Sequence, residues 1–257
     1  MILTADYHTH TPYSHGKNTV EENVKAAKEK GLIQIGITDH GFSHLAFGVK
    51  RKKIPAQRRE CEAAEEKYGV KVLLGVEANI LGDSGKTDVK EEDYASLDLF
   101  VCGKHVNVAY ENFSAWRTYF FGNLLTDKLR RTPSQKLVAY NTRAYVHAIE
   151  KNPVDILSHL GYHCPADVKE VAECVAANGT YLELNSKKQH LTDEELLKIL
   201  ETPVRFVVDS DAHSAGRVGD FALVLEQLKR VNFPMDRIDN IDGRTPNFRF
   251  QAFKGQR

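Results

Sequence analysis

Residues 6–16 read DYHTHTPYSHG, directly after a short apolar run at residues 1–3. This stretch holds three histidines, His8, His10 and His15, within eight residues. Side chains alternate between the two faces of a strand, so His8 and His10 would point the same way, about 7 Å apart. Two imidazoles on one face at a strand end can bind a single metal ion, and the plain alternative is a polar strand end with solvated histidines. The stretch therefore predicts a strand that ends in a candidate metal site.

The rest of the chain repeats one pattern: a short apolar run rich in β-branched residues, a polar cluster, and then a helical periodicity. Strands that alternate with helices predict an α/β fold with a parallel sheet and right-handed crossovers. Closure of this sheet into a barrel explains better than an open sheet how polar residues at many strand ends could converge. We expect one domain over residues 1–257. The predicted strands are residues 2–8, 34–40, 71–80, 97–105, 155–161, 181–186 and 205–213, and the predicted helices are residues 20–30, 55–68, 134–151, 165–178, 193–200 and 221–231.

Two segments depart from this pattern. Residues 106–151 are too long for a simple connection between the fourth and fifth strands. They could form a lid or specificity element, or instead a helix packed on the barrel or an oligomer contact. Residues 236–257 are expected to form a last short strand or turn with a frayed end. The long connection carries an aromatic and basic cluster of Tyr110, Phe113, Trp116, Arg117, Tyr119, Phe120, Phe121, Arg130 and Arg131.

The composition is that of an ordinary globular chain, with 35 basic and 35 acidic residues and a formal net charge of zero. This balance argues against a general binder of long nucleic acids or anionic membranes. No apolar run approaches the length of a transmembrane helix, and no signal peptide is recognisable. The four cysteines show no C-x-x-C spacing. We therefore expect reduced, structural thiols in a cytoplasmic protein.

Polar residues collect at the ends of the predicted strands. Nine side chains of the types that bind metals lie at or just past the end of an apolar run, and seven of them are histidines. Imidazole and carboxylate groups suit divalent ions such as Zn, Mn or Fe. Because scattered histidines would have little reason to choose strand ends, we interpret the set as one metal centre. Its members are His8, His10, His15, His40, Glu77, His105, His159, Asp211 and His213.

The motifs DYHTHT, ITDHG, GVEAN, GKH, LSHLG, ELNS and DSDAH, in this order, closely resemble the PHP family, named for polymerase and histidinol phosphatase domains. The resemblance covers about residues 1–232, and NFPMDRIDNI at residues 232–241 is similar to the bacterial stand-alone phosphatases of this family. It implies a distorted (β/α)7 barrel that holds three divalent metal ions. The implied ligands are His8, His10, Glu77 and Asp211 for the first metal, His15, His40 and His213 for the second, and Glu77, His105 and His159 for the third, with Glu77 bridging.

The resemblance implies a phosphoric monoester hydrolase similar to histidinol phosphatase, whose substrate belongs to histidine biosynthesis. Metals about 3.5–4 Å apart can share a hydroxide formed at neutral pH, which would attack phosphorus in line. This chemistry would depend on Glu77, Asp211 and His213 as catalytic candidates. Three alternatives stay open: an exonuclease-like phosphodiesterase acting on short nucleic acids, an amidohydrolase-like C–N hydrolase, and a metal-dependent binding or scaffold protein.

Basic residues beside the ligand motifs are candidates for binding the substrate phosphate. We expect a small phosphorylated molecule as the partner, no membrane and no long nucleic acid. A homo-oligomer is compatible with the sequence. The basic candidates are Lys104, Lys187, Lys188 and Arg217.

Other polar residues near the motifs are assigned supporting roles. Asp39 would point away from His40 along a strand and orient a neighbour rather than bind metal. Asn185 could donate a hydrogen bond near the site, and His44 and His163 are candidates for protonating the leaving group. The remaining histidines, His147 and His190, are expected on the surface.

Overall fold

The computed structural model describes residues 1–129 and 131–256. Arg130, a member of the aromatic and basic cluster, and Arg257 lie outside the described residues. Seven parallel strands form one sheet in the order β1 to β7, and each predicted strand is confirmed. The strands are β1 (Ala5–Thr9), β2 (Gln34–Ile37), β3 (Lys71–Asn79), β4 (Leu99–Gly103), β5 (Ile156–Leu157), β6 (Tyr181–Asn185) and β7 (Phe206–Asp209).

The sheet curves into a nearly closed barrel, as expected. Consecutive strands pair in parallel from β1 to β7. The two edge strands meet near their carboxyl ends, where Thr9 forms a parallel bridge with Ala212. There the Ala212 N–H donates to the His8 carbonyl (3.1 Å), and the His10 N–H donates to the Ala212 carbonyl (2.8 Å). The barrel is therefore closed at the end where the candidate ligands lie.

At the opposite end, residues 238–241 fill the gap between β1 and β7. The Asn240 side chain donates to the Ala5 carbonyl (2.9 Å) and the Val208 carbonyl (2.7 Å). It also accepts a hydrogen bond from the Val208 N–H (2.9 Å). Buried backbone N–H and carbonyl groups need hydrogen-bond partners. At this end β1 and β7 do not pair with each other, and the Asn240 side chain supplies hydrogen bonds that a neighbouring strand would otherwise make. The distortion of the barrel is located at this junction.

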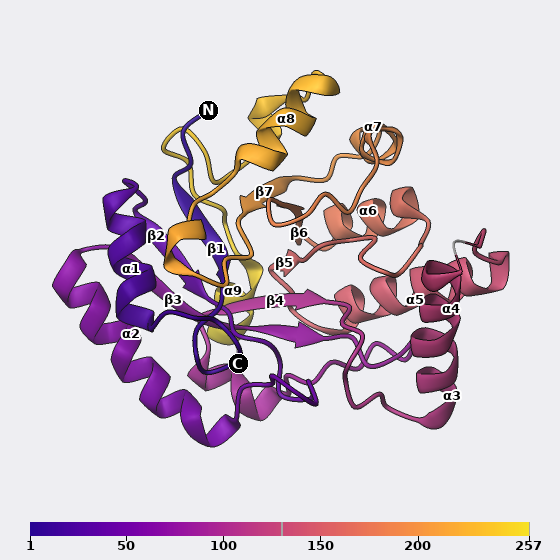
Figure 1. Ribbon diagram of the computed structural model, residues 1–257, viewed down its shortest axis with the longest axis horizontal. Helices are drawn as coiled ribbons and strands as arrows, with labels where there is room; N and C mark the ends of the chain where they lie inside the picture. Colours follow the sequence, from indigo (N-terminus) through magenta and orange to yellow (C-terminus); the bar gives the residue numbers. More distant parts are fainter. Residues whose placement is uncertain (130, 257) are drawn as a thin grey trace.

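Helices connect the strands and cover the outside of the sheet. They are α1 (Val20–Glu29), α2 (Ile54–Tyr68), α3 (Phe113–Ala115), α4 (Asn123–Lys128), α5 (Gln135–Lys151), α6 (Val168–Ala177), α7 (Asp193–Leu200), α8 (Ala222–Arg230) and α9 (Arg249–Gly255). Figure 1 shows α1 and α2 on one side of the strands and α5 and α6 on the other. Local signals set the helix ends: Thr19 and Glu22 form a capping box at α1, and Gly69 ends α2 with a φ of 66°.

The long connection between β4 and β5 contains α3, a π-helical stretch at Trp116–Gly122, α4 and α5. Tyr119 on the π-helical stretch is fully buried, whereas Phe113 and Leu125 are 72% and 50% exposed. Of the described residues in this connection, Val106 and Asn107 line the cavity at the carboxyl ends of the strands, which is called the main cavity below. The short helices themselves pack beside α5, at the lower right of Figure 1.

The expectation of a frayed end is wrong, because α9 is anchored under the barrel. Phe250 is fully buried, and its ring lies 5.1 Å from that of Tyr94 and 5.8 Å from that of Phe100. Its N–H donates to Asp155 Oδ1 (2.8 Å). Phe248, one residue before the helix, packs its ring edge-on against Tyr7 at 4.9 Å. The segment thus covers the amino-terminal end of the barrel with aromatic side chains.

Two expectations from composition can be compared with the fold. The four cysteines are free, as predicted, and Cys61, Cys102 and Cys164 are buried while Cys174 is half-buried. Across residues 1–129 and 131–256, none of the helices combines the length and the apolar character that crossing a membrane requires.

Candidate metal centre

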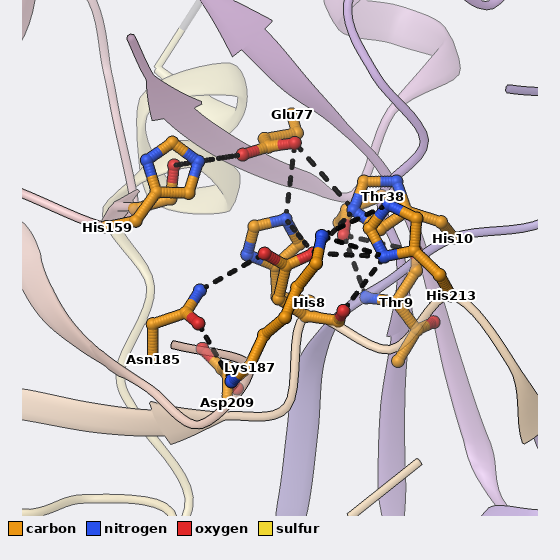
Figure 2. A network of polar contacts seen from close by, with 12 residues as sticks. His8, Thr9, His10, Thr38, Glu77, His159, Asn185, Lys187, Asp209 and His213 are labelled. Carbon is orange, nitrogen blue, oxygen red and sulfur yellow. Dashed lines mark hydrogen bonds and ion pairs between the residues drawn. The ribbon is translucent and has the colours of Figure 1, made fainter. Parts of the chain in front are cut away.

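The candidate ligands converge on one buried carboxylate, Glu77 of β3. Its Oε1 lies 2.6 Å from His159 Nε2 and 3.1 Å from His105 Nε2. Its Oε2 lies 2.9 Å from His40 Nδ1 and 3.3 Å from His8 Nε2. Figure 2 shows Glu77 between His159 on one side and the other imidazoles on the opposite side. A single side chain thereby links histidines from the ends of four other strands.

A second carboxylate, Asp211, lies just beyond β7. Its Oδ1 is 3.2 Å from His10 Nε2, 3.3 Å from His213 Nδ1 and 3.9 Å from His8 Nε2. The backbone of Asp211 has a φ of 47°, and that of His159 a φ of 30°. Residues other than glycine rarely adopt such left-handed conformations, which tend to collect at functional sites. The backbone therefore adopts left-handed conformations at Asp211 and His159, two residues whose side chains point toward the ligand cluster.

Three groups of ligand atoms are compact enough to hold metal ions. Within each group the atoms lie no more than 4.8 Å from one another. The groups share members, so ions bound there would be neighbours. They are His8, His10 and Asp211; His10, His40 and His213; and His40, Glu77 and His105.

These groups resemble the sets implied by the family but differ in three respects, the first being that Glu77 is absent from the group of His8, His10 and Asp211. In the second group His10 takes the place expected for His15, whose side chain is exposed. The His15 ring is nevertheless close, with its centroid 4.8 Å from that of His40. In the third group His40 takes the place expected for His159, which instead forms a direct 2.6 Å contact with Glu77.

The cluster contains buried polar atoms without hydrogen-bond partners among the described residues. A buried donor or acceptor that lacks a partner is costly, and native proteins contain few of them. Cations bound within the cluster would give one ring nitrogen of each imidazole and the Glu77 oxygen a partner, and imidazole and carboxylate donors suit Zn, Mn or Fe. The atoms are His8 Nε2, His10 Nδ1 and Nε2, His40 Nδ1, Glu77 Oε2, and His105 Nδ1 and Nε2.

The electrostatics favour the metal-binding forms of both carboxylates and of several imidazoles, whereas at His8 and His159 neighbouring carboxylates outweigh burial and raise the pKa. Burial raises the pKa of Glu77, but the imidazoles of His105 and His8 outweigh it and hold that pKa well below its usual range. Burial also raises the pKa of Asp211, but His8 and His10 outweigh this effect and hold the pKa of Asp211 well below its usual range. Burial lowers the pKa of His10, and it lowers the pKa of His105 to about 3. Ionised carboxylates and neutral imidazoles are the protonation states required of metal ligands.

Glu183 of β6 is a functional candidate that sequence reasoning misses. Its Oε1 accepts a hydrogen bond from His8 Nδ1 (2.6 Å), and its Oε2 accepts from the His159 N–H (2.6 Å) and Asn185 Nδ2 (3.0 Å). A carboxylate bound to one ring nitrogen holds a histidine in the tautomer whose other nitrogen can bind metal. The signal was present in the ELNS motif, where Glu183 and Asn185 share one face of a buried strand.

Asp39 lies away from the ligand cluster and organises the loop that follows β1. Its carboxylate accepts hydrogen bonds from the Thr11 N–H (2.8 Å), Thr11 Oγ1 (2.5 Å) and Gln57 Nε2 (2.6 Å). Ser14 Oγ is a further donor. This loop connects His10 to His15, so Asp39 orients the loop, in agreement with the role expected for it.

The cavity above the cluster has a volume of about 560 Å³. Seven of its fourteen lining residues are histidines, and aromatic rings are supplied by Phe47 and Tyr162. No serine, threonine or cysteine is among its described lining residues, so no nucleophile of these three types faces it. The predicted site residues that line it are His15, His40, His105, His159, Lys187, Lys188 and Asp211.

His190 lines the cavity, so its expected surface position is wrong. Its ring lies 5.8 Å from that of His159 and 5.1 Å from that of Tyr162, because the loop after β6 turns back over the barrel end. His147 is partly exposed on α5, where its Nδ1 lies 2.6 Å from the Asp83 carbonyl.

The structure brings only two of the four basic candidates to the cavity. Lys187 and Lys188 line it, and Lys187 Nζ lies 3.2 Å from Asp211 Oδ1 and 3.2 Å from His213 Nδ1. Lys104 does not line it, because neighbouring residues point to opposite faces and His105 takes the inner face.

Instead, buried Lys104 donates to the His163 carbonyl at 3.4 Å, and its ammonium lies 5.6 Å from the centre of the Tyr119 ring. Arg217 is also directed elsewhere. It donates to the Ser186 carbonyl (2.9 Å) and pairs with Asp220 at 3.1 Å. The expectation that these two cations bind substrate is therefore not supported by their positions.

Known proteins resemble this chain over nearly its whole length. A family model described as PHP domain matches residues 6–187. A protein named "probable phosphatase" from Caldanaerobacter subterraneus is 31% identical, covering 93% of this chain and 88% of its own length. A protein with the same description from Escherichia fergusonii is 30% identical, covering 93% and 91%.

A solved structure with the same fold is available for comparison. It is the histidinol phosphate phosphatase from Lactococcus lactis, complexed with zinc, L-histidinol and phosphate. The TM-score is 0.60 at 14% sequence identity, and the match covers 96% of this chain and 100% of the other. At this identity the likeness establishes a common barrel architecture.

Proposed function

Because this chain belongs to the PHP domain family, we propose that it is a metal-dependent phosphatase that hydrolyses small phosphate monoesters. The observation that carries the proposal is the buried cluster around Glu77 and Asp211, whose unpaired ligand atoms lie beneath an open cavity of about 560 Å³. The relatives named as probable phosphatases support the same reaction.

The proposal includes three divalent ions, and the zinc in the Lactococcus lactis neighbour supports zinc as one of them. When bound, such ions supply Lewis-acid activation of water and neutralise charge on the phosphate. The candidate catalytic residues Glu77, Asp211 and His213 would hold them in place. The full set of proposed ligands is His8, His10, His15, His40, Glu77, His105, His159, Asp211 and His213.

Residues of the cavity wall would bind and orient the substrate. Lys187 Nζ, beside Asp211 and His213, is close enough to the ligand cluster to donate a hydrogen bond to a phosphate oxygen. We assign protonation of the leaving group to His163, whose Nδ1 lies 2.8 Å from Asp127 Oδ2. His44 is the poorer donor, because burial lowers its pKa to about 4 and leaves it neutral at pH 7.

An exonuclease-like phosphodiesterase acting on short nucleic acids is the second candidate. It is favoured by a hollow of about 490 Å³ that shares Phe47 with the main cavity and is lined by Lys50 and Lys53. The two lysine cations of this neighbouring hollow could hold a second phosphate of a longer substrate.

The test is phosphate release from a panel of monoesters, measured on the full chain as prepared, after chelation, and after addition of Zn, Mn or Fe. Activity that is lost on chelation and restored by metal would support the proposal. His40→Ala and Asp211→Asn should abolish activity, whereas His147→Ala on α5 serves as the control and should not.

Other results would redirect the assignment. Activity on short phosphodiesters alone would favour the second candidate. Metal-loaded protein inert on both ester classes would contradict the proposal and leave a C–N hydrolase or a binding protein.

A further inference from the structure

The charged residues of the main cavity's wall, among the described lining residues, are two lysines and one carboxylate. Among its described lining residues, Asp211 is the only acid. Its Oδ1 lies 3.2 Å from His10 Nε2 and 3.2 Å from Lys187 Nζ, and its Oδ2 accepts from Asn185 Nδ2 at 3.3 Å. Both carboxylate oxygens are therefore engaged with the ligand cluster. No lining carboxylate is left to pair with a positively charged group on a substrate.

The two lysines of the wall occupy different environments. Lys187 reaches the ligand cluster through Asp211 and His213, where the transferred phosphate would lie. Lys188, the next residue, is exposed and forms no ion pair with another described residue. Its backbone N–H donates to Asn185 Oδ1 at 3.3 Å, which holds this residue at the rim of the same cavity. Lys188 thus offers a cation at the rim of this cavity, with no carboxylate partner among the described residues.

Flat aromatic and imidazole rings line the same cavity. The Tyr162 ring lies 4.4 Å from that of His163 and 5.1 Å from that of His190. Phe47 stacks on His15 with a centroid distance of 4.5 Å, and both line the cavity. An aromatic leaving group could pack between such surfaces. A charged substituent on it would meet Lys188, while the Asp127 carboxylate does not line the cavity and already contacts His163 Nδ1 at 2.8 Å.

We propose that the leaving-group side of this cavity selects substrates that carry a second negative charge, with Lys188 as the specificity-determining residue. The inference rests on the proposed phosphatase function and narrows its substrate class to anionic, ring-containing phosphate monoesters. Phosphates with an ammonium on the leaving group, histidinol phosphate included, are poorer substrates because they meet lysine in place of a carboxylate. Exposed ion pairs of this kind alter affinity about twofold to fivefold.

A matched set of aryl phosphates tests this selectivity. The three esters share a para-alkylated phenol as leaving group, and a two-carbon chain on the ring ends in a carboxylate, an amide or an ammonium. For the metal-loaded full chain, we expect kcat/KM to fall about threefold from carboxylate to amide and again from amide to ammonium. Equal or greater activity on the ammonium ester would overturn the proposal.

Two variants distinguish the effect of the Lys188 charge from the effect of the protein's net charge. Lys188→Glu should invert the order of the carboxylate and ammonium esters, measured as the ratio of their kcat/KM values. Lys229→Glu, on the exposed face of α8, changes the net charge equally and should leave the order unchanged. An order unaffected by Lys188→Glu would also overturn the proposal, with phosphatase activity intact.

Binding of the dephosphorylated phenols provides a readout that does not depend on turnover. Calorimetry should show that wild type binds the carboxylate phenol more tightly than the ammonium phenol, and that Lys188→Glu reverses this preference. If none of the esters releases phosphate, the phosphatase proposal fails, and this binding order still decides whether Lys188 selects charge. Equal binding of the two phenols would reject the selectivity itself.

Discussion

Replacing Glu183 with glutamine should weaken metal binding although no proposed ligand is changed. The carboxylate accepts hydrogen bonds from His8 Nδ1, the His159 N–H and Asn185 Nδ2. A glutamine amide offers one acceptor oxygen and one donor nitrogen. If its oxygen faces His8, its nitrogen opposes the His159 N–H, which is also a donor. If the amide is reversed, it donates to His8 Nδ1 and drives the imidazole proton to Nε2, the atom that lies 3.3 Å from Glu77.

The size of the effect follows from burial. The side chains of His8 and Glu183 are 0% exposed, so water cannot replace a lost partner. Leaving a buried donor unpaired costs about 1–3 kcal/mol. Since about 1.4 kcal/mol corresponds to a factor of ten, metal affinity should fall about 10-fold to 100-fold. This is also the range found when residues that support metal ligands are replaced.

The assay is a zinc titration of chelator-treated protein, with bound metal measured by mass spectrometry and phosphate release measured in parallel. At saturating zinc the variant should regain most of the wild-type kcat, because the groups that face the substrate are retained. Glu194→Gln, exposed on α7, removes the same charge and is the control. Wild-type zinc affinity in Glu183→Gln would refute the role assigned to Glu183.

Three other changes test the surrounding structure. Gly103→Ala would place a Cβ atom 2.1 Å from Ser158 Oγ and 2.7 Å from His159 Cε1, so the rate of phosphate release should fall at least about tenfold. Gly216→Ala, where the space is open, is the control. Equal activities of the two variants would contradict the argument. Phe250→Ala should lower the free energy of unfolding in urea by about 3–5 kcal/mol, and a loss below about 1 kcal/mol would be inconsistent with a buried plug. Burial raises the pKa of Asp155 to about 7, so between about pH 4 and pH 7 the native state keeps a proton that the unfolded state has released. The free energy of unfolding therefore falls as pH rises through this range. Asp155→Asn should remove about 3 kcal/mol of this decrease between pH 5 and pH 8. If the free energy of unfolding of wild type and variant changed in parallel with pH, the pKa assigned to Asp155 would be wrong.

The strands and the inward-facing histidines could be predicted because both depend on short-range patterns. An apolar run followed by a histidine marks the carboxyl end of a strand wherever it occurs in a parallel barrel. The same alternation could have placed Lys104 on the outer face, opposite His105. The burial of His190 depends on the path of the loop after β6, which leaves no periodic signal in the sequence.

Other features depend on partners that are distant in the chain. His8 and Glu183 are 175 positions apart, so neither motif reveals the pair. The helix α9 has no strong pattern of its own, and its position is fixed by Phe250 entering a space formed by Tyr94 and Phe100. Packing between residues so distant in sequence can be identified only from the three-dimensional structure of the barrel.

The junction at Asn240 also bears on how the protein is synthesised. Asn240 contacts the Ala5 carbonyl across 235 positions of sequence, so β1 leaves the ribosome long before its closing partner exists. Contacts this distant in sequence form slowly, and an unpaired strand edge invites aggregation until they do. We expect the nascent chain to need protection of β1, and to acquire metal only after translation has passed residue 241. Residues that do not touch the metal centre therefore decide when it can form.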